Sequence, residues 1–232
     1  MALECLLVSR DKEVLHVLRP ALETLSIKLE LSPGVRSGQE ILLSEKFDGV
    51  IVDCDDLEGG VDLLRNLRKG TSNRNSVAFA ILNGTTSTQK AFEVGANFVL
   101  QKPIQPVNAT RCFTAAFGFM TRERRRYFRA PVDMPVTITF SQGEEVSAKA
   151  TNLSEGGMAV KFSGKLPTSA MASVHFTLPD SQDLITPKAT LAWADGSGRA
   201  GIRFVEVPQV SRDRLERWLS SKLEASEAAP MA

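Results

Sequence analysis

Residues 136–162 read VTITFSQGEEVSAKATNLSEGGMAVKF, and they decide the fold of the second half of the chain. The stretch holds three runs rich in apolar and β-branched residues, with no helical pattern between them. The turn-forming pairs Gln142-Gly143 and Gly156-Gly157 separate these runs. Consecutive strands joined by short glycine turns predict an antiparallel, all-β domain. The predicted strands are Val136–Phe140, Val146–Thr151 and Met158–Phe162.

The strand pattern continues downstream and is followed by one helix. The further strands are expected at Ala172–Leu178, Leu184–Ala194 and Gly201–Val207. Six strands of this kind predict an antiparallel β-barrel. Ser211 is predicted to cap the helix, with Val210 and Leu215 as a hydrophobic staple. We expect the apolar face of the helix to cover the barrel, and this face consists of Leu215, Trp218, Leu219 and Leu223.

Upstream of residue 121, short apolar runs alternate with helical patterns. This alternation predicts a parallel sheet covered on both faces, a (βα)5 flavodoxin-like domain. Its strands are expected at Leu3–Val8, Ile27–Leu31, Val50–Val52, Val77–Leu82 and Phe98–Leu100. Its helices are expected at Asp11–Leu25, Gly38–Ser44, Val61–Leu67, Gln89–Val94 and Pro106–Met120. The sequence thus predicts two domains, residues 1–120 and 121–232.

Composition excludes several classes of function. The formal net charge is +1, so the chain has no overall basic excess for nucleic acid. The three cysteines, Cys5, Cys54 and Cys112, are too far apart for a zinc motif or a disulfide framework. We find no catalytic constellation and no cofactor motif, so neither an enzyme nor a metal site is expected. No signal peptide and no spanning segment is visible, which predicts a cytoplasmic protein.

Two motifs in the first half carry a resemblance. Asp53 ends the buried run FDGVIVD, and Lys102 precedes proline in GANFVLQKP. These residues resemble the phospho-acceptor aspartate and the lysine of two-component receivers. The resemblance implies a phosphorylation site at Asp53 and a surface for homo-oligomers. In working receivers, an acidic pair after the first strand holds Mg²⁺ beside the aspartate.

The residues around these motifs depart from the receiver pattern. Ser9 and Arg10 stand in place of the acidic pair, and Asp11 is expected to begin the next helix. The hydroxyl residue that ends the fourth strand is replaced either by Ala80 or by Asn83. We therefore expect a degenerate receiver in which Asp53 is a vestigial phospho-acceptor paired with Lys102. Arg10 is expected to act as a second counter-ion for Asp53.

An arginine-rich segment begins the second half. Residues 121–129 read TRERRRYFR, in which five of nine residues are arginine. A basic run of this kind often forms a solvated linker or a nonspecific nucleic-acid patch. Arginine, however, grips phosphate with a planar fork and stacks on bases, which lysine does not. The polar turn NLSEGG at residues 152–157 offers hydrogen-bonding side chains and two glycines.

Together the two segments resemble the signature of PilZ domains, RxxxR followed by [D/N]xSxxG. Arg125 and Arg129 match its first part, and Asn152, Ser154 and Gly157 match its second part. The segment Gly201-Ile202-Arg203-Phe204 is similar to a late strand of the family. The resemblance implies binding of cyclic-di-GMP on the barrel surface.

The resemblance also implies a role for each residue of the motif. Arg125 and Arg129 would hold phosphate and guanine, and Arg124 would hold a second, intercalated ligand molecule. Asn152 and Ser154 would bond a guanine edge, and Gly157 would keep the turn tight. Arg126 is expected to face solvent.

The most direct interpretation is a cyclic-di-GMP receptor that passes ligand binding to a change of domain arrangement or to an unknown protein partner. Two alternatives remain open at this point. One is a PilZ interaction module of a pilus or motility assembly that binds no ligand. The other is a nucleic-acid-binding regulator that uses the arginine run.

Overall fold

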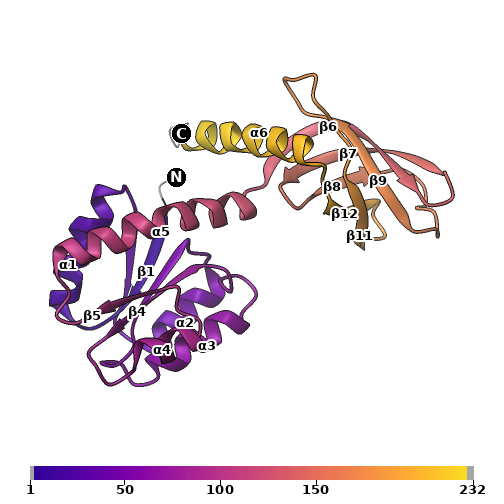
Figure 1. Ribbon diagram of the computed structural model, residues 1–232. Coiled ribbons are helices and arrows are strands. Elements are labelled where there is room, and N and C mark those ends of the chain that lie inside the picture. The colour runs from indigo at the N-terminus through magenta and orange to yellow at the C-terminus, as the bar shows by residue number, and fades with distance from the viewer. Residues whose placement is uncertain (1–2, 229–232) are drawn as a thin grey trace. The chain divides into compact units, whose positions relative to one another are not determined.

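The computed structural model of the chain describes residues 3–228. Its contacts divide the chain into two compact units, residues 1–124 and 125–232. Figure 1 shows an α/β unit and a β-barrel unit, and each is described by itself.

The first unit alternates strands with helices in the predicted order (Figure 1). Its strands are β1 (Glu4–Val8), β2 (Lys28–Ser32), β3 (Gly49–Asp53), β4 (Val77–Leu82) and β5 (Phe98–Gln101). Its helices are α1 (Lys12–Thr24), α2 (Val35–Ser44), α3 (Gly60–Lys69), α4 (Thr88–Glu93) and α5 (Pro106–Tyr127).

The five strands form one parallel sheet in the order β2-β1-β3-β4-β5. This is the flavodoxin-like order, in which the chain winds to both sides of the first strand. Helices α1 and α5 pack on one face of the sheet, and α2, α3 and α4 pack on the other. Central strands β3 and β4 are buried along their whole length, because helices cover both of their faces. The predicted fold of this half is confirmed.

Helix α5 is longer than the sequence pattern predicts. It runs to Tyr127 and not to Met120, so most of the arginine segment is its last turns. No proline or glycine interrupts residues 121–127, and arginine is a good helix former. Cations also stabilise the negative end of the helix dipole. The expected end of the helix at Met120 was therefore wrong.

The second unit is built from strands and one helix. Its strands are β6 (Ala130–Phe140), β7 (Glu145–Ser154), β8 (Gly157–Phe162), β9 (Met171–Thr177), β10 (Leu184–Ile185), β11 (Lys188–Ala194) and β12 (Arg199–Glu206). The antiparallel order is β10-β9-β11-β12-β8-β7-β6, and β9 also pairs with β6. This last pairing closes a six-stranded barrel, as predicted, with β10 attached to β9.

One predicted strand is divided in the structure. The run Leu184–Ala194 forms β10 and β11, separated by Thr186 and Pro187. Proline has no backbone N–H to donate to a sheet, so the strand is interrupted there.

Helix α6 (Gln209–Ala228) packs on the barrel core through Leu215 and Leu219, with Trp218 partly buried beside them. The predicted cover over the barrel is confirmed. The predicted start of this helix was wrong, since Ser211 lies inside the first turn and Val210 is exposed. The carbonyl of Pro208 instead accepts the hydrogen bond from the Arg212 N–H.

None of the helices in the described part of the chain is long and apolar enough to cross a membrane.

Candidate functional site

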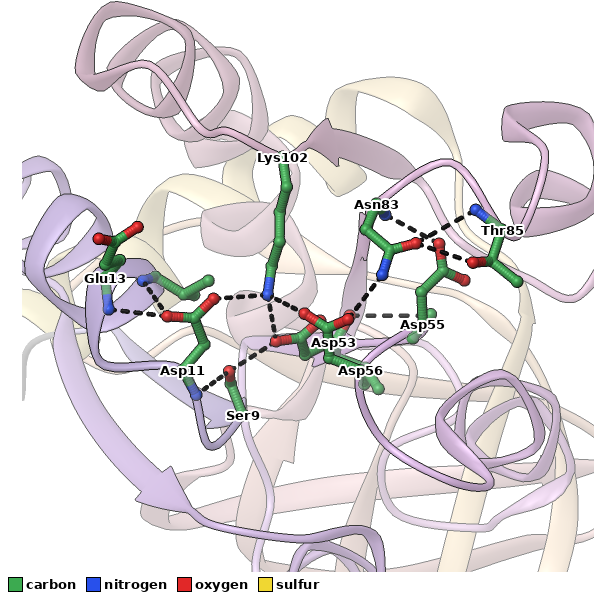
Figure 2. A network of polar contacts seen from close by, with 12 residues as sticks. Ser9, Asp11, Glu13, Asp53, Asp55, Asp56, Asn83, Thr85 and Lys102 are labelled. Carbon is green, nitrogen blue, oxygen red and sulfur yellow. Dashed lines mark hydrogen bonds and ion pairs between the residues drawn. The ribbon is translucent and has the colours of Figure 1, made fainter.

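The carboxyl ends of β1, β3 and β5 bring a polar cluster together in the first unit. Asp53 follows the buried run of β3 and is 1% exposed. Lys102 Nζ donates to Asp53 Oδ2 at 2.9 Å, so the predicted ion pair is confirmed. The same ammonium donates to Asp11 Oδ2 at 2.7 Å and to Asp56. Figure 2 shows Lys102 reaching down between these three carboxylates.

The charges in this cluster stabilise one another. Burial acts to lower the pKa of Lys102, but its hydrogen bonds to Asp11, Asp56 and Asp53 outweigh burial and raise it. The hydrogen bond from Lys102 in turn lowers the pKa of Asp11. Asp11 also caps α1 by accepting from the backbone N–H of Glu13 at 2.8 Å. Lys102 therefore stays cationic among the three aspartates, and Asp11 stays anionic.

Arg10 does not contact Asp53, so the predicted second counter-ion was wrong. Its Nε donates to the carbonyl of Pro33 at 2.8 Å, because its side chain leaves the end of β1 in another direction. Ser9 faces the cluster instead, and its hydroxyl donates to Asp53 Oδ2 at 2.8 Å.

The structure shows which of Ala80 and Asn83 takes the place of the hydroxyl residue at the end of the fourth strand. Ala80 is buried in the middle of β4, whereas Asn83 follows the strand and reaches the acidic residues. Its backbone N–H donates to Asp55 at 2.8 Å, and its Nδ2 donates to Asp56 at 2.6 Å. The sequence interpretation missed Asp55 and Asp56, although the acidic run that follows Asp53 was a visible signal.

The three carboxylates are also the ligand type that Mg²⁺ prefers. Oxygen atoms of Asp11, Asp53 and Asp56 lie within 4.8 Å of one another. Asp53 Oδ1 is buried and has no hydrogen-bond partner among the described residues. The donor set fits a divalent cation, but Lys102 already supplies the positive charge between the carboxylates. In this structure the cluster is an ion-pair network centred on Lys102.

The second unit brings together the two halves of the predicted nucleotide motif. Arg129 Nη1 lies 3.5 Å from the hydroxyl of Ser154, although the two residues are 25 positions apart. The Ser154 hydroxyl donates to the carbonyl of Gly157 at 3.0 Å. Arg129, Asn152, Ser154 and Gly157 line one hollow of about 540 Å³ on the barrel.

Asn152 is oriented by a hydrogen bond within the sheet. Its Oδ1 accepts from the backbone N–H of Ala159 at 3.1 Å, next to an irregularity in the pairing of β7 with β8. Since its oxygen bonds to the backbone, the amide of Asn152 can offer its Nδ2 donor to a ligand.

Gly157 is required for a different reason from the one expected. It is the first residue of β8 and does not have a left-handed backbone. A Cβ at this position would lie 2.1 Å from the carbonyl oxygen of Ile202 in β12. Close approach of two backbones, and not a tight turn, excludes a side chain here.

The other arginines of the segment are arranged differently. Arg124 Nη1 pairs with Asp48 Oδ2 at 3.0 Å, within the first unit. Arg125 lines a separate hollow together with the acidic residues Asp213 and Glu216 of α6. Arg126 is exposed, as expected, but it also lines the hollow that contains Arg129.

The hollow has further residues that the sequence interpretation missed or left without a role. Trp193 of β11 and Arg203 of β12 lie along it. Trp193 carried no signal in the sequence, because only strand pairing places it beside the motif.

Known proteins are similar to each of the two units. A family model described as the PilZ domain matches residues 123–221. The cellulose synthase catalytic subunit of Xanthomonas axonopodis pv. citri is 31% identical over 106 residues, which are 46% of this chain. The match covers only 14% of that relative's length.

Solved structures match the first half of the chain. A CheY-like receiver from Methanospirillum hungatei JF-1 is 20% identical, with a TM-score of 0.46, and covers 53% of this chain and 99% of that one. The receiver of a sensor histidine kinase from Pseudomonas aeruginosa PAO1 is 20% identical, with a TM-score of 0.44. This match covers 51% of this chain and 99% of that one. From the family match and from the strand order of the first unit, the chain carries a PilZ domain at residues 123–221, preceded by a domain with a receiver-like fold.

Proposed function

We propose that the second unit is a receptor for cyclic-di-GMP. The observation that carries this proposal is the meeting of Arg129 with Ser154 at the edge of a 540 Å³ hollow. A guanidinium beside hydroxyl and amide groups suits a ligand that has both phosphates and bases. Binding of this ligand would change the arrangement of the domains or the interaction with a protein partner.

The polar groups of the hollow suit a guanine edge. Guanine offers the acceptors O6 and N7 on one edge and N–H donors on another. Asn152 presents Nδ2, a donor, because its oxygen is held by the backbone of Ala159. The Ser154 hydroxyl donates to Gly157 and accepts from Arg129, which leaves one lone pair for a donor of the ligand.

The proposal predicts that Arg129→Ala weakens cyclic-di-GMP binding about a hundredfold in isothermal titration, since one or two charge-assisted hydrogen bonds are lost. Arg122→Ala is the matched control, because it removes the same charge from the exposed side of α5. Equal affinities for wild type and Arg129→Ala would contradict the proposed site. Absence of binding by the folded wild type would favour the interaction-module alternative. Binding that does not saturate and that weakens steeply as the salt concentration rises would favour the alternative of a nucleic-acid-binding regulator.

Asn152→Asp is expected to strengthen cyclic-di-GMP binding about tenfold. One carboxylate oxygen can still accept from the Ala159 N–H, and the other puts an acceptor where Asn152 has its Nδ2 donor, so the base can turn its N–H edge to position 152 in place of its O6/N7 edge. Hydrogen bonds to charged groups contribute more than neutral ones. The measurement is titration calorimetry beside wild type, and unchanged or weaker binding would show that the base does not turn its N–H edge to position 152.

We further propose that Arg124 couples the ligand to the first unit. Helix α5 is continuous from Pro106 to Tyr127, so Arg124 and Arg125 are neighbours on one helix. Asp48, which accepts from Arg124, is mostly buried and also accepts from the Glu4 N–H at 2.9 Å. Burial raises the pKa of Asp48 even though Arg124 acts to lower it. A ligand phosphate that draws Arg124 away must therefore compete with Asp48.

Asp48→Asn is expected to raise the affinity for cyclic-di-GMP about tenfold, because the competing carboxylate is gone. Small-angle scattering of the ligand-free variant should move toward the profile of ligand-bound wild type. Asp62→Asn, which removes an exposed carboxylate of the same unit, should leave both measurements unchanged. If Asp48→Asn has wild-type affinity and a wild-type profile, Arg124 does not couple the units.

A further inference from the structure

Trp193 belongs to a row of residues that crosses four strands of the barrel. It lies opposite Gly201 of β12, which lies opposite Ala159 of β8, and Ala159 lies opposite Asn152 of β7. Residues directly opposite each other on neighbouring strands carry their side chains on the same face. The next residues along these strands, which include Leu153, Met158 and Ile202, belong to the buried core. The row therefore faces outward.

The side chains of this row form a trough. Its two middle positions are glycine and alanine, which add almost no bulk, and its ends are Trp193 and Asn152. Strands lie about 4.8 Å apart, so three strand spacings separate the two ends by roughly 14 Å. The hollow that holds Arg129 and Ser154 includes all four residues of the row.

The indole of Trp193 leans over the floor of this trough. A Cβ on Gly201 would lie 2.1 Å from Trp193 Nε1 and 2.6 Å from its Cε2. The ring therefore occupies the space that any other residue at position 201 would need. The exposed fraction of Trp193 is nevertheless 50%. This partly exposed aromatic ring lines the same hollow as two arginines, Arg126 and Arg129.

We propose that Trp193 is the stacking platform for one base of the nucleotide ligand, and that Gly201 positions its ring. This inference rests on the proposed function of the second unit. Aromatic side chains stack on bases because every base has a π-face, and the contact contributes substantially to affinity. Asn152, at the other end of the row, would then meet a polar edge of the ligand.

The test is titration of the full chain with cyclic-di-GMP, by calorimetry and by tryptophan emission. The chain has two tryptophans, Trp193 and Trp218, so Trp193→Phe leaves Trp218 as the only emitter. The wild-type emission should change on saturation, and this change should be absent in Trp193→Phe. Trp193→Ala should weaken binding about tenfold to a hundredfold, whereas Trp193→Phe should stay within about threefold.

Two further variants separate stacking from a general loss of exposed apolar surface. Gly201→Ala should weaken binding because the new Cβ displaces the indole without removing it. Leu184→Ala removes an exposed apolar side chain on β10 and should bind like wild type. Wild-type affinity in Trp193→Ala, or an unchanged emission at saturation, would overturn the stacking role and leave the receptor proposal intact. Absence of binding by folded wild type would overturn both.

Discussion

Gly157→Ala is expected to lower the free energy of unfolding of the barrel by about 3 kcal/mol, at the upper end of what overpacking costs. The Cβ would lie 2.1 Å from the carbonyl oxygen of Ile202, well inside contact distance. This obstacle is backbone, so no side-chain rotation relieves it. Gly157 also pairs with Arg203 and with Ser154, and moving it disturbs two strand pairings at once. Ligand binding should be lost together with this part of the sheet.

The neighbouring glycine offers the matched control for this change. A Cβ on Gly156 would meet nothing within 4 Å, so Gly156→Ala should change stability by less than about 0.5 kcal/mol. Both tryptophans lie in the second unit, so urea unfolding followed by tryptophan emission reports on the barrel. Equal midpoints for the two variants would show that the strands at Gly157 adjust freely to a side chain.

Lys102→Met is expected to destabilise the first unit by about 3 kcal/mol at neutral pH. The change leaves Asp53 buried, with Asp11 and Asp56 beside it and without the shared ammonium. Breaking a buried ion pair by removing one partner is costly because the other charge stays in place. Lys90→Met is the control, since Lys90 pairs with Glu93 on the surface and such pairs contribute little.

The pH dependence of this effect follows from the lowered pKa of Asp11. A carboxyl group whose pKa is lower in the folded state stabilises the fold above its unfolded pKa of about 3.9. This contribution is lost as the pH falls through the folded pKa. The difference between wild type and Lys102→Met should therefore be full near pH 7 and shrink below about pH 4. Far-ultraviolet circular dichroism during urea unfolding is the measurement, because most helices lie in the first unit. A difference that stays constant down to pH 3 would show that these carboxylates do not depend on Lys102.

Much of the fold follows from local patterns in the chain. The apolar run Val50–Val52 is buried on both faces, and helices flank it in sequence, so a parallel sheet was predictable. The alternating runs after residue 136 likewise predict the barrel, because side chains of a strand point to opposite faces in turn. The two halves of the nucleotide motif were also visible, since their residue types and spacing are local properties.

Contacts between segments that are distant in the sequence could be identified only from the tertiary structure. The sequence does not say that Ser9, and not Arg10, touches Asp53, because the direction of each side chain depends on how β1 ends. It does not say that Arg124 is held by Asp48, which lies 76 positions away.

The chain by itself therefore determined two domains, their classes and the residues that make a nucleotide site plausible. Only the tertiary structure placed Trp193 across from Gly201 and turned the Asn152 oxygen toward the backbone of Ala159. The physical reason is register. Periodicity tells which face a side chain takes, but strand pairing decides which residues of other strands become its neighbours.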